Sequence, residues 1–174
     1  FLYRPSLENN EAVLRYKDYN GLNELTQTSV RIDQEEETER TLEGDLHYAK
    51  TLKGKDHKWT ADFKYQDSDD RESSDIFQTV DQTGELTQQK VENQEDEQSI
   101  LIQTDYVKPL SGKKSFEIGA KGTLRKIVNN YSVRQLEDGI FENLPRYTND
   151  FTYLENIYAA YAIYNGELKD ITYQ

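Results

Sequence analysis

The feature that most constrains the fold of this chain is the spacing of its glycine-containing turn sequences. Six of the nine glycines lie in such sequences, and these form two series that alternate along the chain. One series contains the turns at 52–55, 110–113 and 165–166, and the other contains those at 20–21, 81–84 and 138–139. Within each series the turns recur roughly every 55–60 residues, which predicts long antiparallel strands reversed at two opposite ends.

The charge balance argues against a nucleic-acid partner. The chain has 33 acidic and 21 basic residues and a net charge of −12, so it lacks the basic surface that nucleic acids require. It has no polybasic segment for anionic lipid either. Only 34% of its 174 residues are hydrophobic, but 13 tyrosines, six phenylalanines and a tryptophan favour an ordered domain over disorder.

Several common features are absent from the sequence. It has no cysteine, which excludes disulfides, thiolate metal sites and a cysteine nucleophile. No stretch approaches 18 apolar residues, and no signal peptide is present. The chain begins at Phe1, contains no methionine and ends within the strand-like run 170–174. We therefore expect it to be a piece of a longer protein.

Apolar and polar residues alternate with a period of two, as in strands that have one apolar face. The clearest example is 59–65, where apolar residues fill the odd positions, and similar patterns occur at 42–48, 100–106 and 116–124. From 157 to 164 both sets of positions are small or aromatic, so this run shows no such alternation. Helix has little support anywhere in the chain.

The alternating windows are short enough to be transmembrane strands. Each is about ten residues long and adjoins a turn of the Gly54 series, and tilted spanning strands need roughly 9–11 residues. Beyond the windows the strands continue as polar sequence, for example at 66–78 and 86–98. Their aromatic residues lie at one level, as in the aromatic girdle of an outer-membrane barrel. A water-soluble meander with one buried face is the competing interpretation.

We predict an all-β, antiparallel up-and-down meander of about eight long strands, part of an outer-membrane β-barrel, with residues 1–174 as one barrel segment. The residues expected to face lipid or form the girdle are Tyr48, Trp59, Phe63, Tyr106, Phe116 and Tyr161. Leu46, Ile102, Ile118 and Ile157 are expected on the same face. The residues expected to face the lumen are Lys58, Asp62, Lys64, Asp105, Glu117 and Lys121.

One segment near the end of the chain resembles a known family. The run 149–161, Asn-Asp-Phe-Thr-Tyr-Leu-Glu-Asn-Ile-Tyr-Ala-Ala-Tyr, resembles a Bacteroidetes outer-membrane β-barrel family related to TonB-dependent receptors. Weaker similarity is found at 58–65, 105–110 and 116–122. The resemblance covers about residues 36–174.

The resemblance implies a location in the cell outer membrane, a large barrel and nutrient uptake powered through TonB. It also implies partners: membrane lipid, the remaining barrel strands and a plug domain, and TonB. The sequence departs from that pattern, because it shows no plug domain, no TonB-contacting segment near residue 1 and no terminal aromatic assembly signal.

The sequence offers little support for a metal or cofactor site. The acidic stretch 67–75 has the charge to attract Ca²⁺ but lacks the spacing of an EF-hand loop, so a solvated strand extension is the favoured interpretation. His47 and His57 are the two histidines, and zinc needs three or four ligands. We therefore expect no metal and no cofactor.

Candidate residues for enzymatic or sugar-binding chemistry are few. Asp45 and Asp62 are able to face each other across a hairpin, as the paired carboxylates of glycosidases do, but acidic pairs are common in this composition. No nucleotide-binding or hydrolase motif occurs, so we expect no enzyme. Tyr131 and Tyr147 lie outside the strand windows and are the candidates for stacking on a sugar.

Two further expectations concern the isolated chain and the alternative to the barrel interpretation. An isolated barrel segment has unpaired edges and an exposed apolar face, so it is expected to self-associate. The alternative to the barrel is a soluble β-sandwich or barrel module that binds carbohydrate or protein at the cell surface. That alternative predicts a closed core in which the apolar windows meet.

Overall fold

The computed structural model describes residues 1–54, 56–111, 114–168 and 171–174. These residues form strands and turns only. The strands are β1 (Leu2–Tyr19), β2 (Leu25–Thr51), β3 (Lys58–Val80), β4 (Leu86–Pro109), β5 (Ser115–Glu137), β6 (Ile140–Asn143), β7 (Asn149–Leu168) and β8 (Ile171–Tyr173). No helix capable of crossing a membrane occurs in the described part of the chain.

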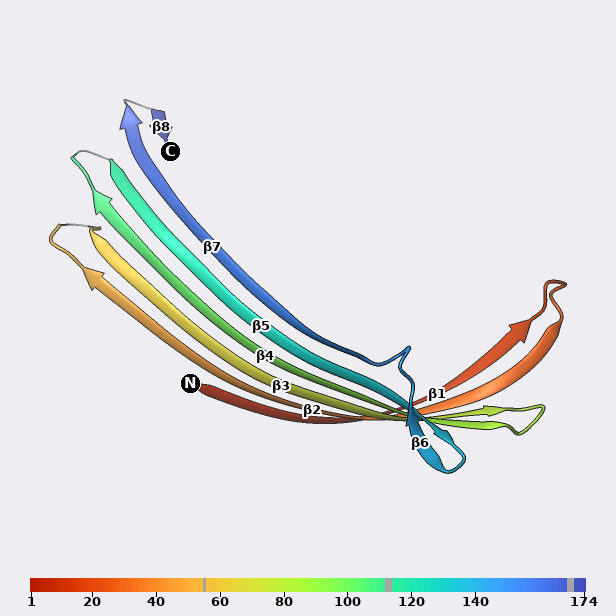
Figure 1. Cartoon of the computed structure of the whole chain (residues 1–174). Helices are drawn as coiled ribbons and strands as arrows, with labels where there is room; N and C mark the ends of the chain where they lie inside the picture. Colours follow the sequence, from red (N-terminus) through yellow and green to blue (C-terminus); the bar gives the residue numbers. More distant parts are fainter. Residues whose placement is uncertain (55, 112–113, 169–170) are drawn as a thin grey trace.

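The strands form a single antiparallel sheet in which sequence neighbours are also spatial neighbours. The order is β1-β2-β3-β4-β5-β7-β8, and the short β6 pairs with β5 beside this path. Figure 1 shows the sheet as one curved layer, with the β2–β3 and β4–β5 turns at one end. At the other end, the β1–β2 hairpin diverges from the β3–β4 hairpin and β6. The predicted all-β antiparallel meander is confirmed.

Glycine permits the backbone conformations required at three of the predicted turns. Gly54, Gly84 and Gly139 have positive φ angles of 113°, 68° and 83°, which other residues adopt only with strain. The predicted turn at 165–166 is wrong, because β7 continues through Gly166, which pairs with Tyr173 of β8. The predicted turn at 110–113 lies partly outside the described residues.

The turns at one end are displaced from each other in a constant direction. The β2–β3 turn closes at Lys58, whose partner in β4 is Val107, and the β4–β5 turn closes two residues further along, at Pro109. The same level crosses β7 at Asn165, and that strand continues three more residues to Leu168. Such a progressive stagger is what strands tilted in a barrel wall require.

The sheet has almost no enclosed interior. Among the described residues, the buried hydrophobic side chains are Ile76, which is 8% exposed, and Val133, which is 7% exposed. No second layer of described residues covers either face of the sheet. The closed core that the soluble-module alternative predicts is therefore not present in the described structure.

Carboxylates cluster where β1 to β4 extend beyond the apolar windows. Pairing places Glu8, Glu37 and Glu72 in one row across three strands, and the row of Glu39, Asp70 and Glu95 lies two residues away on the same face. The charge of Asp70, together with burial and other nearby carboxylates, raises the pKa of Glu37. Partial burial and then Glu39 raise the pKa of Asp70, whose Oδ1 atom is enclosed without a hydrogen-bond partner.

Removing one of these carboxylate charges should stabilise the polar ends of β1 to β4. Because the pKa values of Glu37 and Asp70 are higher in the sheet than in an unfolded chain, these two groups take up protons on folding, and their contribution to stability becomes more favourable as the pH falls from 7 towards about 4. We expect Asp70→Asn to add on the order of 0.5 kcal/mol at pH 7 and little near pH 4. Thermal unfolding of the whole protein in detergent measures this.

A paired carboxylate provides the control. Glu97 accepts two hydrogen bonds of 2.7 Å from the Arg125 guanidinium, so Glu97→Gln should destabilise at pH 7 by about 0.5 kcal/mol. Destabilisation by Asp70→Asn at pH 7 would show that repulsion from nearby carboxylates does not make the ionised Asp70 unfavourable.

A candidate membrane interface on one face of the sheet

The register of the ladder assigns each side chain to one of two faces. Residues directly opposite each other in neighbouring strands point to the same side of a sheet. Trp59 is opposite Tyr106, and Phe63 is opposite Ile102, so these four side chains share one side, here called the Trp59 face. The opposite side carries Asp62 and is here called the Asp62 face.

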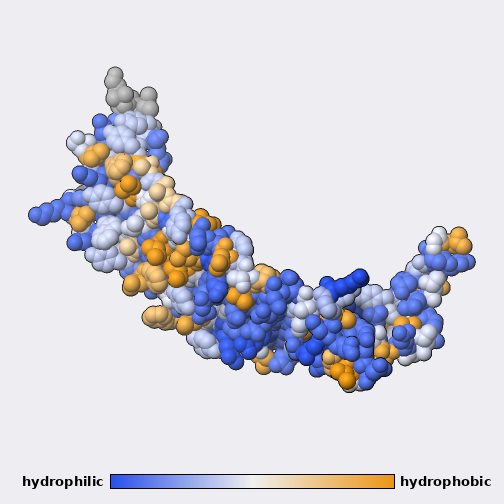
Figure 2. All heavy atoms as spheres, in the orientation of Figure 1, coloured by the Kyte–Doolittle hydropathy of each residue, from blue (hydrophilic) through white to orange (hydrophobic). Residues whose placement is uncertain are grey.

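Apolar side chains on the Trp59 face form a continuous band across five strands. Its rows are Gly44–Tyr65–Ile100–Leu124–Asn156, Leu46–Phe63–Ile102–Gly122–Tyr158, Tyr48–Ala61–Thr104–Ala120–Ala160 and Lys50–Trp59–Tyr106–Ile118–Ala162. Figure 2 shows hydrophobic residues gathered over the part of the molecule nearest the β2–β3 and β4–β5 turns, and hydrophilic residues over the middle. We call this surface the apolar band.

The apolar band is internally packed but uncovered. The rings of Tyr48 and Trp59 meet edge to face with centroids 5.4 Å apart, and the Trp59 indole Nε1 donates a hydrogen bond of 2.8 Å to Thr104 Oγ1. Even so, Leu46 is 67% exposed and Ile102 is 54% exposed. A band of this size left in water would be unfavourable, so its geometry suits a hydrocarbon environment.

Five of the six predicted band residues share the Trp59 face. Tyr48, Trp59, Phe63, Tyr106 and Phe116 all lie on it, and so do the predicted Leu46, Ile102 and Ile118. The sixth residue, Tyr161, lies on the Asp62 face opposite Gly119, and Ile157 shares that side. The assignment of Tyr161 and Ile157 to the same face as Trp59 is therefore wrong, whereas direct lipid contact of the other five stays a prediction.

Hydrogen bonds explain the position of Tyr161. Its hydroxyl lies 2.6 Å from Asp105 Oδ1 and 2.9 Å from Glu117 Oε1 on the two preceding strands of the sheet. Its ring occupies the space over Gly119, where an added Cβ would come within 2.3 Å of the ring. The side chain thus crosses a gap that only glycine leaves open and joins three strands.

The band residues of β7 that the sequence did not reveal are Tyr158, Ala160 and Ala162. Both sets of positions in this strand are small or aromatic, so alternation gives no indication of the face. The sequence signal for the face of Tyr161 was in β5. There Gly119 occupies a polar position of an alternating strand and so marks a site that a large side chain of a neighbouring strand can fill.

The aromatic residues follow the same stagger as the turns. Tyr106 is directly opposite Trp59, while Tyr48 lies two residues further from the turns and Phe116 two residues nearer to them. Tyr164 is opposite Phe116. Aromatics that shift with strand tilt stay at one depth, as a girdle at a membrane surface requires.

The Asp62 face is polar at the same depth. His47 Nδ1 lies 2.6 Å from Asp62 Oδ1, and Lys64 Nζ lies 3.4 Å from Asp45 Oδ1. Asp45 and Asp62 are thus each held by a basic side chain rather than facing each other as a catalytic pair. The residues predicted to face the lumen, namely Lys58, Asp62, Lys64, Asp105, Glu117 and Lys121, all lie on this face.

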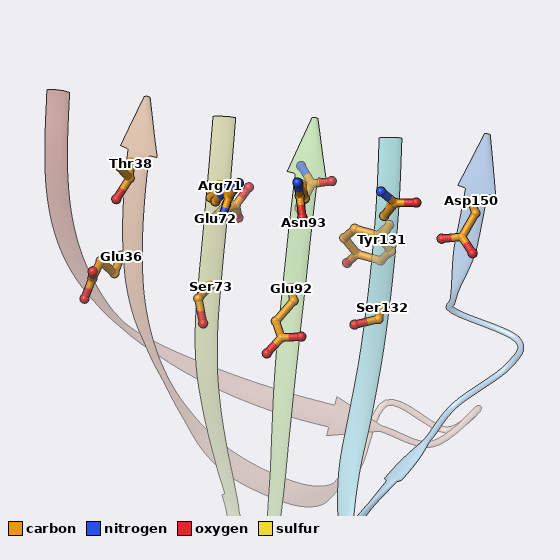
Figure 3. A pocket seen from close by; sticks show the side chains of 12 residues that line it. Glu36, Thr38, Arg71, Glu72, Ser73, Glu92, Asn93, Tyr131, Ser132 and Asp150 are labelled. Atoms are coloured by element: carbon orange, nitrogen blue, oxygen red, sulfur yellow. The ribbon is translucent and has the colours of Figure 1, made fainter. Parts of the chain in front are cut away.

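Beyond the apolar band, one candidate pocket on the Trp59 face is polar. It is a hollow of about 460 Å³ lined from β2, β3, β4, β5 and β7, and its lining includes Arg71, Glu92 and the candidate sugar ligand Tyr131. Figure 3 shows these side chains side by side along neighbouring strands. The second candidate, Tyr147, is 63% exposed in the connection before β7. The pocket therefore has one of the two candidate sugar-stacking tyrosines, Tyr131, in its lining.

The acidic stretch 67–75 divides between the faces. Asp67, Asp69 and Asp75 lie on the Trp59 face, whereas Asp70 and Glu72 lie on the other. Among the residues that the structure describes, no three acidic or histidine side chains are arranged to hold a metal ion. The structure thus supplies no geometry for the calcium alternative.

Comparison with known families agrees with the two-faced sheet. The model of a family described as "Outer membrane protein beta-barrel family" matches residues 50–174. The chain belongs to this outer-membrane β-barrel family. No curated protein matches the chain. The matched span contains β3, β4, β5 and β7, so it includes four of the five strands that form the apolar band.

Membership in the outer-membrane β-barrel family places the chain in the cell outer membrane and therefore in a membrane lipid environment. In such barrels the outward face is apolar over a height of about 25 Å and the inward face is polar. The Trp59 face has the character of that outward face and the Asp62 face that of the inward face, and we propose this orientation of the wall. The longer polar ends of the strands would then lie on the extracellular side.

Adjacent residues of β4 test this assignment. Ile102→Glu places a charge on the Trp59 face and should destabilise the membrane-embedded barrel by about 1–2 kcal/mol. Leu101→Glu places the same charge on the Asp62 face, opposite Lys64, and should change stability little. Chemical unfolding of the whole protein in lipid vesicles compares the two variants. Equal losses would show that the faces are not distinguished by lipid.

The fit of Tyr161 over Gly119 makes a separate prediction. Gly119→Ala should displace the Tyr161 ring and its hydroxyl contacts, at a cost of about 1–3 kcal/mol. Gly122→Ala in the same strand is the control, since its added Cβ would lie 3.4 Å from Tyr158, an ordinary contact. The unfolding midpoint in detergent measures both, and a control variant that loses as much as Gly119→Ala would contradict the prediction.

Proposed function

We propose that this chain forms part of the wall of a barrel that takes up a solute across the outer membrane, in a protein related to the TonB-dependent receptors of Bacteroidetes. The observation that supports this most is the polar inner face at the depth of the apolar band. There, ion pairs such as Lys64–Asp45 line the side away from lipid. A wall that is wet on the inside at membrane depth suits a barrel with an aqueous or plugged lumen.

The extracellular part of the inner face narrows the class of solute. The two carboxylate rows that contain Glu37 and Asp70 face the inside of the wall. A surface of one charge sign concentrates ions of the other sign and repels like ions. We therefore propose that the entrance favours neutral or cationic solutes over anionic ones.

The proposed partners follow from the barrel architecture. Residues 44–51 of β2 pair only with β3, and residues 149–165 of β7 pair only with β5, among the described residues. Further strands of the parent barrel would satisfy these edges, with a plug in the lumen and TonB on the periplasmic side. Open edges and an uncovered apolar band also support self-association of the isolated chain.

We propose a role without catalysis. The acidic side chains of the inner face lie open along strands, and those nearest to each other at membrane depth are paired with His47 and Lys64. An acid–base mechanism needs carboxylates that converge on one bond with separated proton affinities. The arrangement supports lining and steering functions instead.

Solute flux through the whole protein tests uptake. Cells that produce the protein should accumulate a permitted solute, and this accumulation should stop when the proton gradient of the inner membrane is collapsed, because TonB coupling depends on that gradient. Candidate solutes of matched size and different charge should rank with cations ahead of anions.

The comparison strain lacks the protein. Flux that persists without the gradient would show that the solute enters by passive diffusion rather than by energised uptake. Flux equal to that of the strain without the protein would reject a transport role altogether and leave the barrel with another task.

A further inference from the structure

A groove crosses the Trp59 face at the extracellular border of the apolar band. It encloses about 220 Å³ between β3, β4, β5 and β7. The residues of its lining that matter here are Gln98, Ile100, Leu124, Lys126, Leu154 and Asn156. By register, all six lie on the outside of the wall, which is the side that meets lipid.

The groove has an apolar floor and a polar rim. Ile100 and Leu124 are opposite each other and form the last apolar row of the band. Leu154, one row beyond, is 67% exposed and extends this floor. A side chain of this kind at the edge of a lipid-facing band suits contact with hydrocarbon.

Donor groups at the rim are free. Lys126 forms no ion pair, and the amides of Gln98 and Asn156 form no side-chain hydrogen bond, within the described structure. Lys126 is opposite Gln98, and Asn156 is opposite Leu124. Asp67, the carboxylate in the same row two strands away, already accepts a 3.0 Å hydrogen bond from the Tyr65 hydroxyl. An ammonium between two amide groups suits one small anion.

A second hollow lies deeper on the same face. It encloses about 370 Å³ and is lined by Trp59, Ile118, Ala120 and Ala160 among others. Gly122 lies between the two hollows in β5, with the ring of Tyr158 beside it. A flexible hydrocarbon chain leaving the first groove would pass over Gly122, beside the Tyr158 ring, to reach the second hollow.

We propose that this groove binds one phosphorylated lipid of the outer leaflet, with its phosphate on Lys126, Gln98 and Asn156 and an acyl chain along Leu124 towards Ala120. The occupant is a lipid rather than free phosphate because the floor is apolar and continuous with the lipid-facing band. The leaflet follows from the position of Lys126 at the start of the long polar extensions. The site is independent of whether the barrel transports anything.

Native mass spectrometry of the whole protein in detergent tests the site, with phosphatidic acid as the probe. We expect the wild-type protein to retain phosphatidic acid more strongly than diacylglycerol with the same acyl chains. Lys126→Glu should weaken retention about fivefold or more, since one basic group near a headgroup contributes about a factor of five. Lys121→Glu, in the same strand on the inner face, is the matched control and should retain the lipid as the wild type does.

Other results would overturn the proposal. Equal retention by the wild type and Lys126→Glu would remove Lys126 from the site, and equal weakening by Lys121→Glu would show a general charge effect. Displacement of the lipid by millimolar inorganic phosphate would show a phosphate site without an acyl groove. The shift of the folded barrel on unheated gels confirms that each variant is folded before its lipid is measured.

Discussion

The continuous hydrogen-bonded ladder between long antiparallel strands is the constraint on which the rest of this structure depends. The long strands offer their neighbours extended backbone pairing, which is unbroken for example from Ser29 to Thr51 of β2 against β3. Pairing fixes the register, the register fixes the face of every side chain, and a shift of one residue would reverse both faces. A single layer with no interior has no other means of separating hydrocarbon from water.

The same ladder accounts for the two zones along the strands. Where apolar residues alternate with polar ones, as at Trp59 and Asp62, one face suits lipid and the other an aqueous lumen. Where both faces are polar, as around Glu37 and Asp70, the wall stands in water on each side. Carboxylates gather there in unfavourable rows on the Asp62 face, so this part of the sheet gives up some stability at neutral pH while gaining an acidic surface.

Glycine has two separate tasks in this wall. At Gly54, Gly84 and Gly139 it permits the positive φ angles of tight reversals. At Gly119 it has a strand conformation, and its missing side chain admits the ring of Tyr161 from β7. The resulting contacts of Tyr161 with Asp105 and Glu117 tie three strands together across the Asp62 face. A wall one layer thick gains from such contacts because it lacks a packed core.

The sequence by itself determined the strand class, the up-and-down order and the face of every residue from Leu46 to Ile118 that was assigned. Alternation with a period of two is a local property, so Trp59 and Phe63 could be placed without knowing their neighbours. Only the tertiary structure decided the face of Tyr161 and Ile157 and the continuation of β7 through Gly166. In that strand the residues on both sides are similar, and the side that each one takes is set by its partners in β5 and β8.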